Sequence, residues 1–451
     1  MSAVNAPDLS RVLVAGLGVT GRAVVEALKA RNCEVLAVDD QPTPVAAVAE
    51  ELRVELLDSS SATELERAFS GITAVVPSPG IPCHHLLYRL ADASGVEILS
   101  ELDLAALWND RPCAAVTGTN GKTTVTELTT QMLLASGMQA AAVGNTDTPF
   151  VSAIDDKEIG YEVFVVEASS FRLDRVRRFR AKAAAWLNLA PDHLDWHENF
   201  QAYARAKSKI WEMQQEGDVA VAPHDDVAVG PWTKNISSQL LTFGLGKGDV
   251  HCTDRELIAH GERIMKISEL RRSRPHDQLN ACAATALALS MDASAKSVAE
   301  VLGNFDGLAH RLEFVATADG VRFFDDSKAT TPHATVAGMT GFDQAVLIAG
   351  GRNKGLDLLE LRELAPRLAG VVVIGESAET LTHVFDGIVT TTLANSMEEA
   401  VKAAMSIAQS SGGDVVLSPA CASFDWYRNY NERGDDFQRF VRLLKQGQIQ
   451  P

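Results

Sequence analysis

The sequence has few cysteines, and they lie far apart along the chain. Its 451 residues contain Cys33, Cys83, Cys113, Cys252, Cys282 and Cys421, with no Cys-x-x-Cys pair. This spacing suggests neither a zinc knuckle nor a disulfide framework. Scattered thiols are typical of a reducing cytosol, and we therefore expect a cytoplasmic protein.

The sequence also lacks long apolar runs. Residues Met1 to Leu9 are polar and contain no apolar core of the kind found in a signal peptide. No apolar run elsewhere is long enough to cross a bilayer as a helix. We therefore expect no membrane insertion.

Positive charge is in deficit. Forty-one Lys and Arg residues face 59 Asp and Glu residues, which gives a net charge of −18. This balance argues against a nucleic-acid partner and against a basic membrane-binding patch. It does not exclude a phosphate ligand, because local loops decide that. The length predicts two to four domains, and 46% hydrophobic residues suffice for sizeable cores.

A glycine-rich turn between a strand and a helix is the most informative stretch. Residues 113–116 predict a buried strand end, and residues 125–134 have apolar residues at helical spacing. The turn between them supplies backbone N–H groups and a helix start for phosphates, Lys122 as a charge and Thr123 as a Mg²⁺ ligand. Val116 stands where the general phosphate-loop pattern has Gly. The alternative is a helix start with a surface Lys.

A second glycine turn lies near the amino terminus. Residues 11–15 predict a strand, Gly16 to Gly21 form a complete G-x-G-x-x-G, and a helix follows from Arg22 to about Arg31. The strand at 34–38 ends at Asp39-Asp40. Read alone, this fingerprint predicts an NAD-dependent oxidoreductase. The turn recognises a diphosphate, so a nucleotide-sugar diphosphate fits it equally well.

Residues 117–124, Thr-Gly-Thr-Asn-Gly-Lys-Thr-Thr, resemble the ATP loop of the Mur ligases, the amino-acid ligases of peptidoglycan precursor synthesis, and of the related folylpolyglutamate synthetases. Further stretches resemble the Mur branch that joins D-glutamate to UDP-N-acetylmuramoyl-L-alanine, among them Asp-Ser-Lys-Ala-Thr at 326–330 and Ser-Pro-Ala-Cys-Ala-Ser at 418–423. The resemblance covers nearly the whole chain. It implies a cytoplasmic ligase that consumes ATP with Mg²⁺ and forms an acyl phosphate.

The predicted fold is α/β with three domains, because strands and helices alternate throughout. We expect a Rossmann-like UDP-substrate domain at 1–105, a P-loop ATPase-like ATP domain at 106–306 and a dinucleotide-fold-like amino-acid domain at 307–451. Each would have a mostly parallel sheet flanked by helices. We expect a monomer that binds UDP-N-acetylmuramoyl-L-alanine and D-glutamate.

Carried over residue by residue, the resemblance implies sites for both nucleotides. The expected ATP ligands are Gly118, Thr119, Asn120, Gly121, Lys122, Thr123, Thr124, Asn280, Arg311 and Asp326. The expected UDP-substrate ligands are Thr20, Asp39, Asp40, Ser78, Asn145 and Ser169. Three positions depart from the family pattern. The family commonly has a basic residue near Gln41, usually has Gln where this sequence has Arg172, and has Asn where it has Asp277. Read as isolated motifs, the Ser78 turn and the Gly144-Asn145 turn are also compatible with plain turn chemistry.

The resemblance also implies a metal centre. Thr123, Glu167, His193 and Lys207 would hold two Mg²⁺ ions, Lys207 after CO₂ has converted its amine to a carbamate. With Lys122, the last three would be the catalytic residues. Without the resemblance, Glu167 reads as a strand-end acid, His193 as part of a solvated loop and Lys207 as a helix-surface charge. His193 is also one candidate for the general base.

The remaining implied residues bind D-glutamate, and they are Lys328, Thr330, Ser423, Phe424 and Tyr430. Residues 350–355 form another Gly turn, for which we predict no nucleotide. Cys421 is not expected to be a nucleophile, because no His motif partners it. The competing functions are a folylpolyglutamate-type ligase, an NAD oxidoreductase and a switch-type NTPase. The amino-terminal Gly16–Gly21 turn counts against the first of these.

Overall fold

The computed structural model describes residues 6–156, 159–194 and 196–449. The chain packs into two compact units. The first consists of residues up to 189 with 196–270 and 279–304, and the second of residues 190–195, 271–278 and 305 onward. Among the described residues, no helix is both long enough and apolar enough to cross a membrane.

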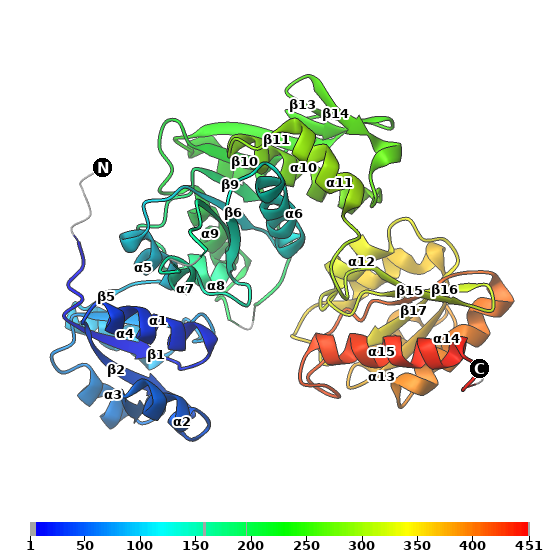
Figure 1. The fold of residues 1–451 in the computed structure, drawn as a ribbon. Helices are drawn as coiled ribbons and strands as arrows, with labels where there is room; N and C mark the ends of the chain where they lie inside the picture. Colours follow the sequence, from blue (N-terminus) through cyan, green and yellow to red (C-terminus); the bar gives the residue numbers. More distant parts are fainter. Residues whose placement is uncertain (1–5, 157–158, 195, 450–451) are drawn as a thin grey trace. The chain divides into compact units, whose positions relative to one another are not determined.

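The first sheet is parallel, with strand order β3-β2-β1-β4-β5 (Figure 1). Its strands are β1 (Arg11–Ala15), β2 (Glu34–Asp39), β3 (Glu55–Asp58), β4 (Ala74–Pro77) and β5 (Glu97–Ile98). Its helices are α1 (Val19–Ala30), α2 (Pro42–Leu52), α3 (Ala62–Ala68) and α4 (Leu86–Ser94). Strand order reverses between β1 and β4, and in such sheets ligands bind outside the carboxyl ends at that point.

The second sheet has the order β14-β13-β12-β11-β10-β9-β6-β8-β7. Its parallel part is β6 (Cys113–Thr117), β7 (Ala140–Gly144), β8 (Val163–Glu167), β9 (Ala183–Trp186), β10 (Val219–Pro223), β11 (Gln239–Leu245) and β12 (Val250–Cys252). The antiparallel extension is β13 (Glu256–Ala259) and β14 (Glu262–Lys266).

The helices of this part of the chain cover and flank the second sheet (Figure 1). They are α5 (Glu101–Trp108), α6 (Lys122–Ala135), α7 (Phe150–Ala153), α8 (Ser170–Leu173), α9 (Phe200–Ser208), α10 (Pro275–Ser290) and α11 (Ala295–Asn304). Short 3₁₀ turns add η1 (Lys209–Trp211), η2 (Gly230–Asn235) and η3 (Ile267–Glu269).

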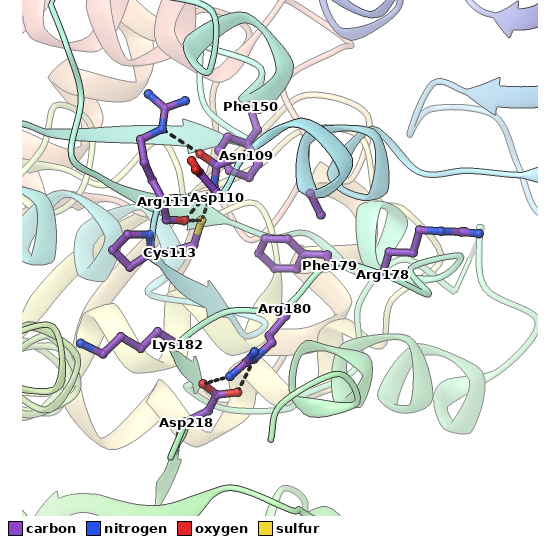
Figure 2. A pocket seen from close by; sticks show the side chains of 12 residues that line it. Asn109, Asp110, Arg111, Cys113, Phe150, Arg178, Phe179, Arg180, Lys182 and Asp218 are labelled. Carbon is purple, nitrogen blue, oxygen red and sulfur yellow. Dashed lines mark hydrogen bonds and ion pairs between the residues drawn. The ribbon is translucent and has the colours of Figure 1, made fainter. Parts of the chain in front are cut away.

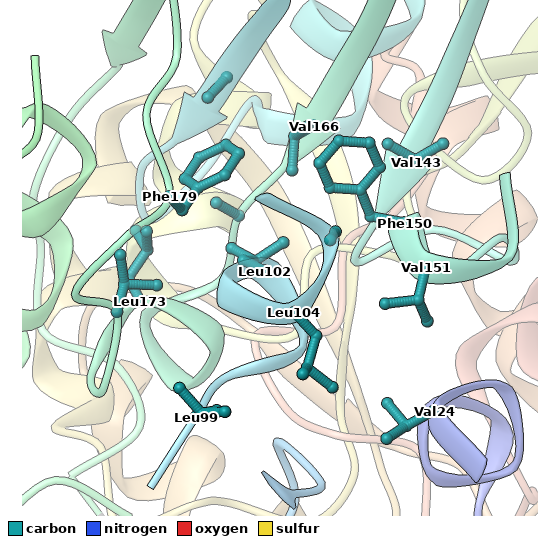
Figure 3. Packing of buried hydrophobic residues seen from close by; sticks show 14 of the residues in the cluster. Val24, Leu99, Leu102, Leu104, Val143, Phe150, Val151, Val166, Leu173 and Phe179 are labelled. Atoms are coloured by element: carbon teal, nitrogen blue, oxygen red, sulfur yellow. The ribbon is translucent and has the colours of Figure 1, made fainter. Parts of the chain in front are cut away.

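One apolar core joins the two sheets of the first unit. Figure 3 shows Leu102 and Leu104 of α5 beside Val151 of α7, with Val24 of α1 at the same cluster. All four side chains are buried. Removing such side chains from water supplies most of the favourable free energy of folding. The nucleotide-turn sheet and the phosphate-loop sheet are therefore parts of one packed body.

The sheet of the second unit has the order β15-β16-β20-β17-β18-β19. Its strands are β15 (Glu313–Ala318), β16 (Val321–Asp325), β17 (Ala345–Gly350), β18 (Leu368–Ile374), β19 (Thr391–Leu393) and β20 (Val415–Leu417). Its helices are α12 (Pro332–Met339), η4 (Leu358–Arg367), α13 (Ala378–Phe385), α14 (Met397–Ser411) and α15 (Tyr430–Lys445). Apolar cores lie on both faces, and β15 alone pairs antiparallel.

The predicted α/β class is confirmed, with mostly parallel sheets flanked by helices. The predicted domain boundaries stay predictions. The boundary at residue 105 falls inside α5 (Glu101–Trp108), and the one at 306 follows α11.

Candidate active site

The phosphate loop has the predicted strand–turn–helix form. β6 ends at Thr117, and α6 begins at Lys122. Gly118 has φ of +158° and Gly121 has φ of +84°, and such positive φ values favour glycine. The Nζ atom of Lys122 donates to the carbonyl oxygens of Gly118 and Thr119, at 2.9 and 3.0 Å. Its ammonium is therefore held over the loop.

Asn188 holds this loop in place through three hydrogen bonds, and the sequence did not predict a role for it. The backbone N–H groups of Thr119 and Asn120 donate to Asn188 Oδ1, at 3.0 and 2.9 Å. In return, Asn188 Nδ2 donates to the carbonyl of Asn120 at 3.1 Å. Asn188 is the second residue after the end of strand β9, and its place after a strand was the sequence signal for this role, because β9 pairs with β6.

Glu167 ends the strand beside the loop. It pairs in register with Val116 of β6, and its side chain is buried at 2% exposure. Oε1 accepts a hydrogen bond from Asn145 Nδ2 at 2.9 Å. Among the described residues, Oε2 is buried without a hydrogen-bond partner. Because an unpaired buried carboxylate oxygen is costly, this atom suits a metal ligand.

Gly144 makes the contact between Asn145 and Glu167 possible. A Cβ atom at Gly144 would lie 2.5 Å from the Glu167 carbonyl oxygen, and φ is +97°. The Asn145 N–H donates to that same carbonyl at 2.8 Å. The Gly-Asn turn therefore has a specific reason for its glycine beyond simple turn formation.

Lys207 is buried at 1% exposure, which excludes its interpretation as a helix-surface charge. Its Nζ donates to the Gly118 carbonyl at 2.7 Å, so it lies against the phosphate loop. It also lies 4.5 Å from the ring centroid of Tyr203. The Tyr203 hydroxyl is 3.1 Å from Thr119 Oγ1, a second contact between α9 and the loop.

Asn280 of α10 lies against the other side of the loop. A Cβ atom at Gly121 would be 2.6 Å from Asn280 Oδ1. Gly121 and Asn280 therefore meet at this turn, although they are 159 positions apart in the sequence. Thr124 follows within the first turn of α6.

The amino-terminal Gly turn is built by close packing. A Cβ atom at Gly21 would lie 1.7 Å from the Gly16 carbonyl, so only glycine fits there. Ser78 Oγ donates to the same carbonyl at 2.8 Å. Asp39 Oδ2 accepts from the Leu17 N–H at 2.9 Å, which ties the end of β2 to the turn. Ser78 and Asp39 thus both shape the turn.

Asp40 lies beside two residues that the sequence did not single out. Ser59 Oγ donates to Asp40 Oδ1 at 2.7 Å, and His85 Nε2 lies 3.1 Å from the same oxygen. Gln41 is exposed. Ser169, two residues after the end of β8, is the N-cap of α8, and its Oγ accepts from the Arg172 N–H at 3.4 Å.

In the second unit, His193 belongs to the short segment 190–195. Its Nε2 lies 3.3 Å from Asp192 Oδ2, and its φ is +54°. Asp192 Oδ1 accepts from Lys354 Nζ at 3.0 Å. Lys354 lies in the Gly350–Gly355 turn, which the sequence left without a role. This contact brings that turn to the His193 segment.

The two predicted amino-acid loops are joined by one buried cation, Arg433 of α15. It donates to Ser327 through Nε and Nη2, at 3.0 and 2.8 Å, and to the Cys421 carbonyl through Nη1 at 3.0 Å. It is 1% exposed, and burial lowers its pKa to about 10. No sequence motif indicated this residue, because its partners lie in distant segments.

The predicted D-glutamate residues flank these loops. Lys328 Nζ lies 3.7 Å from the ring centroid of Tyr430, and Ser327 Oγ donates to the Tyr430 carbonyl at 2.8 Å. Ser423 is buried, whereas Phe424 is 62% exposed. The Thr330 N–H donates to the Lys328 carbonyl at 2.9 Å. The structure therefore gathers Lys328 and Tyr430 directly.

Asp326 and His310 are buried titratable groups of the same unit. Burial raises the pKa of Asp326 to about 7, against the opposing effect of the bond from Ser418 Oγ at 2.8 Å. A 2.7 Å contact between His310 Nδ1 and Asp325 Oδ2 raises the pKa of His310. Glu313 completes a His310–Glu313–Asp325 cluster whose oxygens already accept protein hydrogen bonds.

Three other positions that the sequence singled out have plainer surroundings. Arg311 is half-buried, and its carbonyl accepts from Arg272 Nη2 at 3.2 Å. Cys421 is buried, and burial raises the pKa of its thiol, which opposes a nucleophilic role. Asp277 pairs with Arg272 at 3.0 Å.

A cavity of about 380 Å³ lies by the amino ends of strands β6, β9 and β10 of the second sheet. The phosphate loop follows the carboxyl end of β6, so the cavity lies at the opposite end of these strands. Its basic lining residues do not converge. Figure 2 shows Arg180 paired with Asp218, and the ends of Arg111, Arg178 and Lys182 pointing in different directions. This cavity is separate from the phosphate loop.

Comparison with known proteins matches three family models to the chain. They are a Mur ligase MurD-like N-terminal domain at 10–100, a Mur ligase middle domain at 116–288 and a Mur ligase glutamate ligase domain at 310–421. Among solved structures, a pseudomurein peptide ligase type C from Methanothermus fervidus matches with a TM-score of 0.60 at 16% identity. That match covers 97% of this chain and 100% of the other, and it supports the fold alone.

Curated relatives match along nearly the whole length. A UDP-N-acetylmuramoylalanine–D-glutamate ligase of Desulfosudis oleivorans is 39% identical, covering 97% of both chains. One of Frankia casuarinae is 38% identical, covering 96% of this chain and 93% of the relative. The chain belongs to the Mur ligase family, and its sequence places it beside the members that carry this name.

Proposed function

We propose that this protein is an ATP-dependent amide-forming ligase that joins D-glutamate to UDP-N-acetylmuramoyl-L-alanine in peptidoglycan precursor synthesis. One observation carries the proposal. A chain similar over 97% of its length to ligases of that name holds a phosphate loop beside the buried, partly unpaired carboxylate of Glu167. That combination favours phosphoryl transfer over simple nucleotide binding.

The chemistry explains why ATP is consumed. A carboxylate does not react with an amine at neutral pH, because its oxygen is a poor leaving group. An oxygen of the substrate carboxylate attacks the γ-phosphorus of ATP, ADP departs, and an acyl phosphate forms. The amine of D-glutamate then attacks the acyl carbon, loses a proton, and expels inorganic phosphate to give the amide.

The residues of the first unit have distinct proposed roles. Lys122, held over the loop by two carbonyls, offsets charge on the phosphates. Thr123 and Glu167 would supply oxygen ligands for Mg²⁺, which Mur ligases use, and Oε2 of Glu167 fits that role. Bound Mg²⁺ would supply further charge neutralisation. We propose two ions, with His193 as a further ligand.

Lys207 is the proposed carbamate. Its burial disfavours an ammonium ion, and its Nζ already lies 2.7 Å from the Gly118 carbonyl. The ammonium first loses a proton, and the neutral amine then adds to CO₂ and loses a second proton. A cation thus becomes an anion with two oxygens for Mg²⁺. This change favours metal binding beside the phosphate loop.

The substrate assignments follow the two sheets and the loops of the second unit. We propose that Thr20, Asp39, Asp40, Ser78, Asn145 and Ser169 serve the UDP-substrate, and that Asn280, Arg311 and Asp326 join the loop in binding ATP. Lys328, Thr330, Ser423, Phe424 and Tyr430 are the proposed D-glutamate residues. We further propose that the protein acts as a monomer in the cytoplasm.

The test is phosphate release with ATP, Mg²⁺, UDP-N-acetylmuramoyl-L-alanine and each enantiomer of glutamate. We expect release that depends on the UDP-substrate and on D-glutamate, with amide product in equal amount. Release without any amino acid, and without product, would instead identify a switch-type NTPase. A preference for a folate substrate would favour the folylpolyglutamate alternative.

A further inference from the structure

A buried ion pair lies where the nucleotide turn of the first sheet meets the second sheet. Arg172 of α8 and Glu101 of α5 are 6% and 3% exposed. Arg172 Nη1 donates to Glu101 Oε2 at 2.7 Å. Burying both charges is costly, and such a pair is retained only where its geometry and its other hydrogen bonds compensate.

Both partners are tied to further elements. Glu101 Oε1 accepts from the Val151 N–H at 2.9 Å, so both of its oxygens are engaged. The second guanidinium nitrogen, Nη2 of Arg172, donates to Thr20 Oγ1 at 2.9 Å. Thr20 lies within the Gly16–Gly21 turn, where the first turn of α1 begins. The ion pair therefore reaches the amino-terminal helix through one hydroxyl.

This hydrogen bond fixes what Thr20 can do. Because Oγ1 accepts from a guanidinium, the hydroxyl hydrogen has to point to a different acceptor. A bond from a cation also polarises the hydroxyl and makes it a better donor. A donor at a helix start beside a Gly turn is suited to a phosphate oxygen.

We propose that Arg172, held by Glu101, is a positioning residue for the diphosphate of a nucleotide sugar and acts through Thr20. This inference rests on the proposed function, since it assumes that the Gly turn binds such a diphosphate. It also gives a role to Arg172, which replaces the Gln expected from the family resemblance. A lone Gln here would leave the charge of Glu101 buried without its cation.

A second observation supports a ligand or water oxygen as a hydrogen-bond acceptor near Arg172. Among the described residues, Nε of Arg172 is buried and has no hydrogen-bond partner. An unpaired buried donor is costly, so a bound water or ligand oxygen at Nε would relieve that cost. This Nε–H donor belongs to the same guanidinium group that donates to Thr20.

The experiment compares UDP with UMP by calorimetry, because the two differ by the β-phosphate. The variants are Thr20→Val, which removes the hydroxyl at constant shape, and the pair E101Q/R172Q, which removes both charges together. ADP binding to each variant serves as the folding control. If the wild type binds neither uridine nucleotide, the proposed function fails before any variant is compared.

We expect each variant to weaken UDP binding about ten- to a hundredfold, the range for a charge-assisted hydrogen bond, with little change for UMP. Adding Thr20→Val to E101Q/R172Q should weaken UDP no further, because both changes remove one interaction. Wild-type UDP binding with an unchanged UDP-to-UMP ratio in E101Q/R172Q overturns the inference and leaves the proposed function standing. Fully additive losses also overturn it.

A variant that keeps the charge covers the case in which E101Q/R172Q does not fold. Arg172→Lys retains a cation for Glu101 but has a single nitrogen in place of the planar fork that reaches two partners. We expect it to lose the preference for UDP while ADP binding stays at the wild-type level. An unchanged preference in Arg172→Lys overturns the inference.

Discussion

The Nζ atom of Lys207 donates a hydrogen bond of 2.7 Å to the carbonyl oxygen of Gly118, which places a buried lysine directly on the phosphate loop. The contact links α9 to the turn that precedes α6. It is the structural basis for expecting Lys207 to act in catalysis.

Lys207→Ala should therefore be nearly inactive in ligation. The carbamate would supply negative charge for two cations beside the triphosphate, and alanine supplies none. Short carboxylic acids added to this variant are expected to restore part of the rate, and removal of CO₂ should slow the wild type reversibly. A fully active Lys207→Ala enzyme at saturating Mg²⁺ would contradict the carbamate proposal.

Lys122→Ala should abolish ligation while UDP-substrate affinity stays nearly unchanged. The reason is that Lys122 contacts the loop of the second sheet, whereas four of the six proposed UDP ligands lie at the turn of the first sheet, namely Thr20, Asp39, Asp40 and Ser78. Calorimetry and phosphate release measure the two effects separately. Lys247→Ala, a change at an exposed lysine of the same unit, is the matched control and should leave both unchanged. A comparable loss of UDP-substrate affinity in Lys122→Ala would refute two separate phosphate sites.

The Gly16–Gly21 turn should bind a uridine diphosphate and not NAD. The turn itself recognises a diphosphate, and the rest of the chain belongs to the Mur ligase family. Titration with NADH, followed by competition with UDP, measures both ligands at one site. Micromolar NADH binding that no uridine nucleotide displaces would overturn this prediction.

Asp326 should make the second unit less stable as pH rises from about 4 to about 7. Burial raises its pKa to about 7 from the ordinary aspartate value of about 4, so the folded state binds the proton more tightly than the unfolded state. The contribution of the protonated Asp326 to the free energy of unfolding is fully present below the pKa of the unfolded state. It is lost as pH rises to the pKa of the folded state. Urea midpoints at pH 4.5 and pH 8 should therefore differ less in Asp326→Asn than in the wild type. An identical pH dependence in both proteins would show that Asp326 does not titrate in this window.

Gly434→Ala should destabilise the second unit by about 1–3 kcal/mol through overpacking. A Cβ atom at this position of α15 would lie 2.2 Å from His310 Nδ1 and 2.7 Å from Asp325 Oδ2. Gly303→Ala in α11 is the control, because its nearest neighbour would be the Glu269 carbonyl at 3.6 Å. That variant should gain about 0.5–1 kcal/mol from better helix propensity. Equal unfolding midpoints for the two variants would rule out the close packing at Gly434.

The sequence by itself determined the local elements. Strand, glycine turn and helix at residues 113–135 follow from an apolar run, two positive-φ glycines and helical periodicity, all within one short segment. The same local signals predicted the parallel α/β sheets. Once that context is present, the residue types at Lys122 and Thr123 indicate phosphate and Mg²⁺ binding.

Only the tertiary structure decided which side chains meet. Helical periodicity alone indicated a surface position for Lys207, whereas packing of α9 buries it against Gly118, 89 positions away. Arg172 meets Thr20 across 152 positions, and Arg433 meets Ser327 across 106. Such pairs form because the packing of apolar cores brings distant elements together. The local sequence pattern does not show which polar groups become neighbours in that packing.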